Sequence, residues 1–199
     1  KYRYLHFATH AVPSIERAFE SSLFLSRNHL SDPPEAAVAG RDIVDGRLMA
    51  AEILRTWNLE ADLVVLSACQ TAVGLHTQEE GFLGFAQALF LAGARSVLLT
   101  LWKVDDTATT LLMTRFYENL LGVRRGLPQP MHKAEALREA QRWLRGLSRP
   151  EVEALLKRFP ALERGAERPI KDASPAAGGD YLYASSRYWA AFILIGDPE

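Results

Sequence analysis

Cysteine is almost absent from this chain: Cys69 is the only one among 199 residues. A lone cysteine excludes an intrachain disulfide and any zinc site built from several cysteines. A chain without disulfides fits a reducing compartment, so we expect a cytoplasmic protein. An excess of charge of one sign is also missing, since the formal net charge is −1. We therefore expect no nucleic acid contact and no binding to a membrane surface.

Long hydrophobic runs and cofactor motifs are missing as well. The most apolar stretch, residues 82–101, carries Gln87 and Arg95 and is interrupted at Gly93, which favours a core helix followed by a core strand over a membrane span. The sequence has no Gly-x-Ser-x-Gly elbow, no phosphate-binding loop and no Gly-x-Gly-x-x-Gly motif. Serine-elbow hydrolases, NTPases and dinucleotide-binding proteins are thereby disfavoured, and we expect no cofactor.

What remains is typical of a globular α/β protein. Apolar residues make up 48% and charged residues 24%, which predicts one domain, 1–199, with a substantial core. Apolar runs predict strands over residues 2–9, 22–26, 62–67, 96–101 and 188–195. Helical spacing of apolar residues predicts helices over residues 49–57, 81–92, 106–121, from 130 or 131 to 147, and 150–156. Alternation of strands and helices predicts βαβ units with a parallel sheet.

Two further expectations concern the organisation of the chain. Residues 122–180 begin with a basic Gly/Pro-containing break and end in a polar stretch rich in Pro, Gly and Ala, so we expect an insertion or mobile region there. The chain begins with Lys1, already inside a strand pattern and without a signal peptide. We therefore expect a fragment of a longer protein.

One thiol and one imidazole fall where predicted strands end. Cys69 follows the run 62–67, and His10 follows the run 2–9. Ligands bind at the carboxyl edge of parallel strands, so these two side chains predict a Cys-His dyad despite a separation of 59 residues. A free cysteine has a pKa near about 8.5 and needs such a neighbour to attack a carbonyl as its thiolate.

Other interpretations of the same residues stay open. A cysteine at a strand end can be an inert core residue or a redox-sensing thiol. His6 and His10 are four apart, a spacing that makes a metal pair on a helix, but on a strand they lie about 13 Å apart, so we expect no metal site. Three further histidines, His29, His76 and His132, are expected at the surface.

Four segments resemble the CHAT domain family, caspase-like peptidase modules often fused to tetratricopeptide repeats. Residues 5–11, Leu-His-Phe-Ala-Thr-His-Ala, resemble its histidine motif, and residues 63–71, Leu-Val-Val-Leu-Ser-Ala-Cys-Gln-Thr, resemble its cysteine motif. Residues 80–106 resemble the segment that follows, and residues 188–198 its last strand. The resemblance spans nearly the whole chain apart from roughly residues 122–180.

The resemblance implies a caspase-like three-layer α/β/α sandwich with a mostly parallel central sheet, and a cysteine endopeptidase. Cys69 is then the nucleophile and His10 the general base, with the main-chain amides of Ala11 and Cys69 forming the oxyanion hole. Many relatives have glycine where this chain has Ala11, so a backbone with positive φ would be strained there. Neither a metal nor a cofactor is implied.

The resemblance also bears on substrate and partners. The strand after the cysteine motif helps line the primary specificity pocket in this fold, which implies that Asp105, Asp106 and Trp102 contact the substrate and favour cleavage after Arg or Lys. The alternative is that both aspartates cap the helix that follows. The expected partners are a protein or peptide substrate and a regulatory repeat domain in the same protein or a partner chain. A catalytically silent caspase-like interaction module is the alternative function, and it predicts a lost or misaligned dyad.

Overall fold

The computed structural model describes residues 2–14, 16–26, 44–67, 69–70, 79–158 and 180–199, together with residues 28, 38 and 40. The chain forms two compact units. The first comprises Lys1–Lys103 with Ile195–Asp197, and the second Val104–Leu194 with Pro198–Glu199. Within the described ranges no helix is both long and apolar enough to cross a bilayer.

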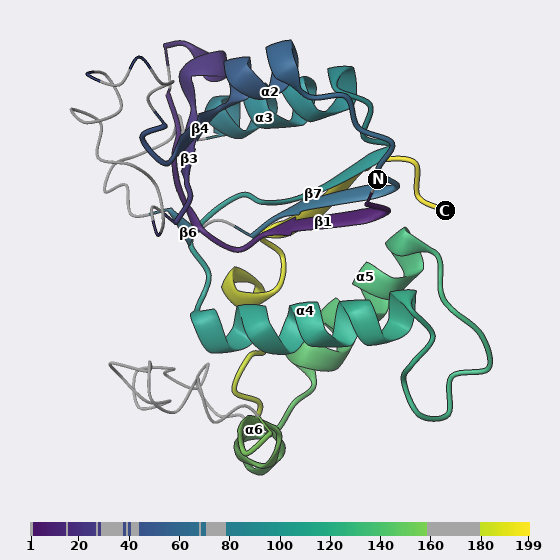
Figure 1. Ribbon diagram of the computed structural model, residues 1–199. Helices are drawn as coiled ribbons and strands as arrows, with labels where there is room; N and C mark the ends of the chain where they lie inside the picture. The colour runs from purple at the N-terminus through teal and green to yellow at the C-terminus, as the bar shows by residue number, and fades with distance from the viewer. Residues whose placement is uncertain are drawn as a thin grey trace. The chain divides into compact units, whose positions relative to one another are not determined.

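The central sheet contains β1 (Tyr4–Phe7), β5 (Leu63–Leu66), β7 (Ser96–Thr100) and β8 (Phe192–Gly196), in the order β1-β5-β7-β8 (Figure 1). β1 pairs with β5 and β5 with β7 in parallel. Every residue of β5 and β7 is buried, as expected for strands that are apolar on both faces. The predicted α/β class with a mostly parallel sheet is confirmed.

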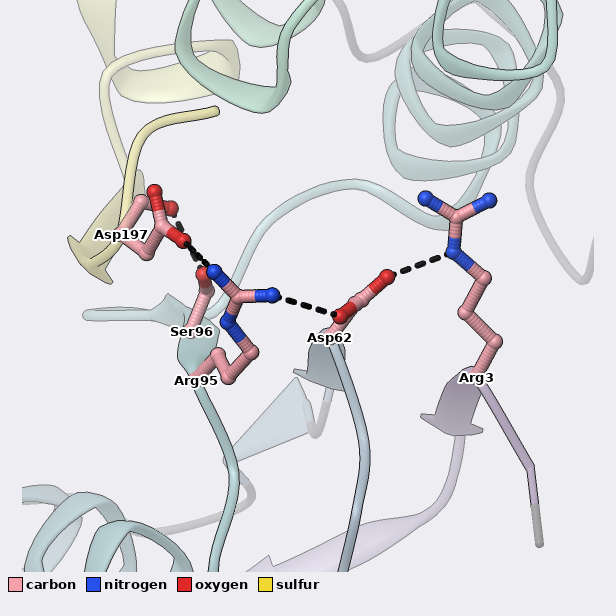
Figure 2. Close-up of polar contacts among 5 residues, drawn as sticks. All are labelled: Arg3, Asp62, Arg95, Ser96 and Asp197. Carbon is pink, nitrogen blue, oxygen red and sulfur yellow. Dashed lines mark hydrogen bonds and ion pairs between the residues drawn. The ribbon is translucent and has the colours of Figure 1, made fainter.

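A row of charged side chains lines one edge of this sheet (Figure 2). Asp62, just before β5, pairs with Arg3 at 2.5 Å and with Arg95 at 3.5 Å. Arg95 also pairs with Asp197 at 2.8 Å, and Ser96 Oγ donates to the Asp197 carbonyl at 2.7 Å. The end of β8 therefore meets the start of β7, so β8 runs opposite to the other three strands.

The last predicted strand is wrong in its bounds and in its burial. Residues 188–195 were expected to form a strand buried on both faces, but Ser186–Tyr188 form the 3₁₀ helix η3 and β8 begins only at Phe192. Phe192 is buried, whereas the next three residues are partly exposed. β8 lies at the end of the strand order, where only one neighbour covers it.

A second sheet contains strands of two or three residues. These are β4 (Arg47–Met49), β3 (Ser22–Phe24), β2 (His10–Val12) and β6 (Cys69–Gln70), in the order β4-β3-β2-β6. The expectation of one strand over residues 2–9 is wrong, because β1 ends at Phe7 and the chain enters β2 at His10. β4 was not predicted, since three residues are too few to show the alternation of apolar and polar residues that is typical of a strand.

The two faces of this second sheet differ. Ala11, Leu23 and Leu48 are aligned across β2, β3 and β4, and all three are buried. The neighbouring row on the other face is His10, Phe24 and Arg47, and all three are exposed. Alternation of side chains along each strand produces this division. The second sheet therefore has one apolar face and one accessible face that carries His10.

The remaining elements of the first unit are η1 (Ala18–Glu20), α2 (Ala50–Thr56) and α3 (Glu79–Leu91). α2 and α3 lie together beside β3 and β4 (Figure 1). α3 approaches η1 so closely that a Cβ on Gly84 would overlap the backbone of Ala18. Gly93, two residues after the end of α3, has φ of +107°, so the expected break between helix and strand at this glycine is confirmed.

The second unit is built on α4 (Asp106–Leu120), α5 (Lys133–Arg145) and α6 (Arg149–Leu156). These helices lie within a few residues of their predicted bounds, because each has a continuous apolar stripe. α4 and α5 pack against each other, and the buried residues of the two helices include Leu112, Phe116, Ala140 and Leu144. Residues 159–179, most of the expected polar loop, lie outside the described residues.

Candidate functional site

The backbones of His10 and Cys69 are direct neighbours. β2 and β6 pair in parallel, with His10 opposite Cys69 and Ala11 opposite Gln70. Adjacent strands lie about 4.8 Å apart. β1 continues into β2 and β5 into β6, so the chain passes twice, in parallel, from the central sheet to the second sheet. His10 and Cys69, the two residues selected from the sequence, are therefore paired in register where the chain passes from the central sheet to the second sheet.

His10 is fixed from its other side by β3. Its Cα partner there is Phe24, and the Thr9 hydroxyl donates a hydrogen bond to the Phe24 carbonyl. His10 itself is exposed. The backbone of His10 is therefore held by neighbouring strands on both sides, and its imidazole is accessible.

Ala11 lies in the middle of β2 and is 2% exposed. Its backbone is that of a strand, so the strain expected from alanine at a position with positive φ does not arise here. β2 is paired on both sides, with β3 and β6. Donation by the Ala11 amide to an oxyanion stays a prediction.

A second histidine contact lies just before the passage between the sheets. The Nε2 atom of His6 lies 2.7 Å from the Oγ atom of Ser67, and the Ser67 amide donates to the Phe7 carbonyl at 3.1 Å. Partial burial lowers the pKa of His6, so the imidazole is neutral near pH 7. The contact ties the end of β1 to the residue after β5.

Sequence reasoning treated His6 only as a possible metal ligand and missed this contact. The sequence did indicate this contact, because His6 and Ser67 lie in two predicted strands that were expected to be parallel. His6 lies four residues before His10, and Ser67 lies two residues before Cys69. His6 and His10 lie in different strands, β1 and β2. Among the described residues, no three histidine, cysteine or acidic side chains converge on a possible metal position.

Asp105 caps a helix. It is the N-cap of α4, and its Oδ1 atom accepts a hydrogen bond from the Ala108 amide at 2.8 Å. Asp106 is the first residue of α4, where negative charge is favourable. Trp102 follows β7 and is 38% exposed. The helix-capping interpretation therefore accounts for Asp105, and contact of these three residues with a substrate stays a prediction.

The mixed α/β fold with a mostly parallel central sheet is consistent with the caspase-like class of proteins. A model of the CHAT domain matches residues 1–197. The chain therefore belongs to the CHAT domain family, and the family resemblance found in the sequence is confirmed. Membership implies a caspase-like fold and a possible peptidase.

One relative carries tetratricopeptide repeats in its name. Tetratricopeptide repeat protein 28 of Mus musculus is 35% identical to this chain over 94 residues. The aligned part covers 47% of this chain and 4% of the mouse protein, so the chain spans a small part of that relative. The name of this relative is consistent with the expected repeat domain.

Proposed function

We propose that this chain is a cysteine endopeptidase in which Cys69 attacks the peptide bond and His10 transfers the proton. The parallel register of His10 with Cys69 carries this proposal, because it makes the two backbones neighbours although the residues are 59 positions apart in sequence. The exposure of His10 on the accessible face of the second sheet supports it. The whole chain, 1–199, would act as one peptidase domain of a longer protein, with an insertion within 122–180.

The reaction follows from these two groups. His10 accepts the thiol proton, and the sulfur forms a bond to the substrate carbonyl carbon. The resulting oxyanion accepts hydrogen bonds from main-chain amides, for which we propose Ala11 and Cys69; one such donor contributes about 3–4 kcal/mol. His10 then protonates the leaving amine as the C–N bond breaks. Water, deprotonated by His10, hydrolyses the thioester and restores the thiol.

Substrate choice and regulation are separate parts of the proposal. Asp105, Asp106 and Trp102 would favour a basic residue before the scissile bond, and Asp105 could use the carboxylate oxygen that does not cap α4. A repeat region, in the same protein or in a partner chain, would bind a partner and control access to the dyad. The lone cysteine supports a cytoplasmic location.

Hydrolysis of fluorogenic peptides by the intact protein tests this proposal. We expect cleavage after Arg or Lys that is lost in Cys69→Ala and in His10→Ala. His132→Ala is the matched control, because His132 is exposed, lies before α5 and makes no side-chain capping bond. Turnover that survives in either dyad variant would contradict the proposal. Turnover absent from the unmodified protein would favour the silent interaction module.

A further inference from the structure

A fixed cation lies in the same row of residues as His10. On the accessible face of the second sheet, Arg47 is the Cα partner of Phe24, and Phe24 is the partner of His10. Cross-strand partners point to the same face of a sheet. All three residues are exposed, and Val12, two residues after His10 on the same face, is 49% exposed. The row therefore runs from β4 across β3 to the proposed dyad.

The guanidinium of Arg47 is held in place. Its Nη2 atom donates to Ser22 Oγ at 3.0 Å, and its Cζ atom lies 5.8 Å from the centre of the Phe24 ring. Ser22 is 1% exposed and donates its own hydroxyl proton to the Glu20 carbonyl at 3.0 Å. A buried hydroxyl and an aromatic face thus restrict an otherwise flexible side chain.

No carboxylate neutralises this cation within the described part of the chain. Asp45 is the nearest acidic residue in sequence, and its Oδ1 atom accepts the main-chain amide of Arg47 at 2.9 Å instead of pairing with the guanidinium. Arg3, Arg17 and Arg95 of the first unit each pair with an acidic side chain, whereas Arg47 and Arg55 have no such pair among the described residues. Arg47 therefore keeps donors that match the two oxygens of a carboxylate.

We propose that Arg47 binds an acidic side chain of the peptide substrate, two or three residues from the bond that is cleaved. This inference rests on the proposed peptidase function. Arg47 lies two strand spacings from His10, about 10 Å, and an extended peptide advances about 3.3 Å per residue, so that distance corresponds to about three residues. The guanidinium lies over β3, in contact with the Phe24 ring and with Ser22, which brings the charge closer to β2. The exposed ring of Phe24 contacts the intervening part of the peptide.

Matched peptides test the inference. Internally quenched peptides carry a single cleavable bond and differ only in Glu, Gln or Lys at the second or third residue on either side of it. For the intact protein we expect kcat/KM about fivefold higher with Glu than with Gln, mainly through KM, as for a partly exposed ion pair. The ratio should fall to about one in Arg47→Gln, invert towards Lys in Arg47→Glu, and be partly retained in Arg47→Lys.

Arg55→Gln is the control, because Arg55 is an exposed arginine of α2 in the same unit and should keep both the ratio and the basal rate. A ratio near one in the unmodified protein, or one that Arg47→Gln leaves unchanged, overturns the inference. Binding of the same peptides to Cys69→Ala, followed by fluorescence anisotropy, separates the two proposals. Arg47-dependent preference for Glu without turnover supports the site and contradicts only the peptidase function, whereas equal binding of all peptides overturns the site.

Discussion

At the scale of single residues, His6 and Ser67 hold the point where the chain leaves the central sheet. The Nε2–Oγ distance of 2.7 Å joins the end of β1 to the residue after β5, and each segment continues within four residues to the proposed dyad. Ser67 is 8% exposed, so loss of its partner would leave a nearly buried hydroxyl unsatisfied.

His6 should make stability depend on pH in a defined direction. Burial lowers the pKa of folded His6 below the value of 6.5 expected in the unfolded chain. Below pH 6.5 the unfolded state binds the proton first, so stability is present above that pH and is lost as the pH falls through the lowered value. We expect the unfolding free energy from urea titrations to drop more steeply between pH 7 and 5 than in His6→Gln. Parallel curves for the two proteins would contradict this prediction.

Asp105 offers a way to separate capping from specificity. Asp105→Ala removes the acceptor of the Ala108 amide and should cost about 1 kcal/mol of stability. Asp105→Asn keeps an acceptor oxygen and should cost little, while it removes the charge. Thermal unfolding measures the first effect, and the ratio of Arg to neutral peptide cleavage measures the second. Unchanged selectivity in Asp105→Asn would leave Asp105 as a cap alone.

At the scale of elements, α4 and α5 are joined by a group of polar contacts around Glu139. Arg115 donates to both oxygens of Glu139, with Nη2–Oε1 at 2.6 Å and Nε–Oε2 at 2.9 Å, and Asn119 Nδ2 donates to Glu139 as well. Burial by itself raises the pKa of Glu139, but the hydrogen bonds from Arg115 and Asn119 and the charges of Arg115 and Arg124 outweigh it and hold that pKa below 4.5.

Glu139→Gln should therefore destabilise the pair of helices. Hydrogen bonds to a charged group contribute about 1.5–3 kcal/mol, and we expect a loss of about 2 kcal/mol near pH 7. The difference should shrink as the pH falls below 4.5, because a carboxyl group with a lowered pKa gives stability only where it is ionised. Glu135→Gln, an exposed change in the first turn of α5, is the control. Equal urea midpoints for both variants would contradict the prediction.

The elements differ in how far their sequence predicts them. The helices α4, α5 and α6 and the strands β5 and β7 were predicted because each carries a continuous apolar pattern. β2, β4 and β6 contain three residues or fewer, and their state depends on pairing with strands distant in sequence. The passage of β1 into β2 was missed for this reason, although His10 and Cys69 were both identified from the sequence and the family.

At the scale of the whole molecule, the two ends of the chain meet at one edge of the central sheet. Asp62 and Arg95 connect Arg3, before β1, to Asp197, after β8 (Figure 2). The amino ends of the three parallel strands β1, β5 and β7 lie at this edge. The carboxyl ends of β1 and β5, which lead to His10 and Cys69, lie at the opposite edge. Charge contacts on this edge are therefore expected to act on stability and not on activity.

Asp197→Asn tests that separation. It removes the negative charge from the 2.8 Å contact with Arg95, while the main-chain carbonyl that accepts from Ser96 remains. We expect a slightly lower melting temperature at low ionic strength and no difference at about 1 M salt, where exposed charges are screened. Peptide cleavage should be unchanged. A loss of activity without a loss of stability would show that this edge contributes to the site.

The reactivity of the Cys69 thiol towards iodoacetamide, measured across pH, tests the central claim most directly. If His10 lies beside Cys69 and accepts its proton, the unmodified protein should label rapidly well below about pH 8.5, the ordinary value for a cysteine. In His10→Ala the labelling curve should move up towards that value, and in His132→Ala it should stay unchanged. Identical curves for the unmodified protein and His10→Ala would contradict the account.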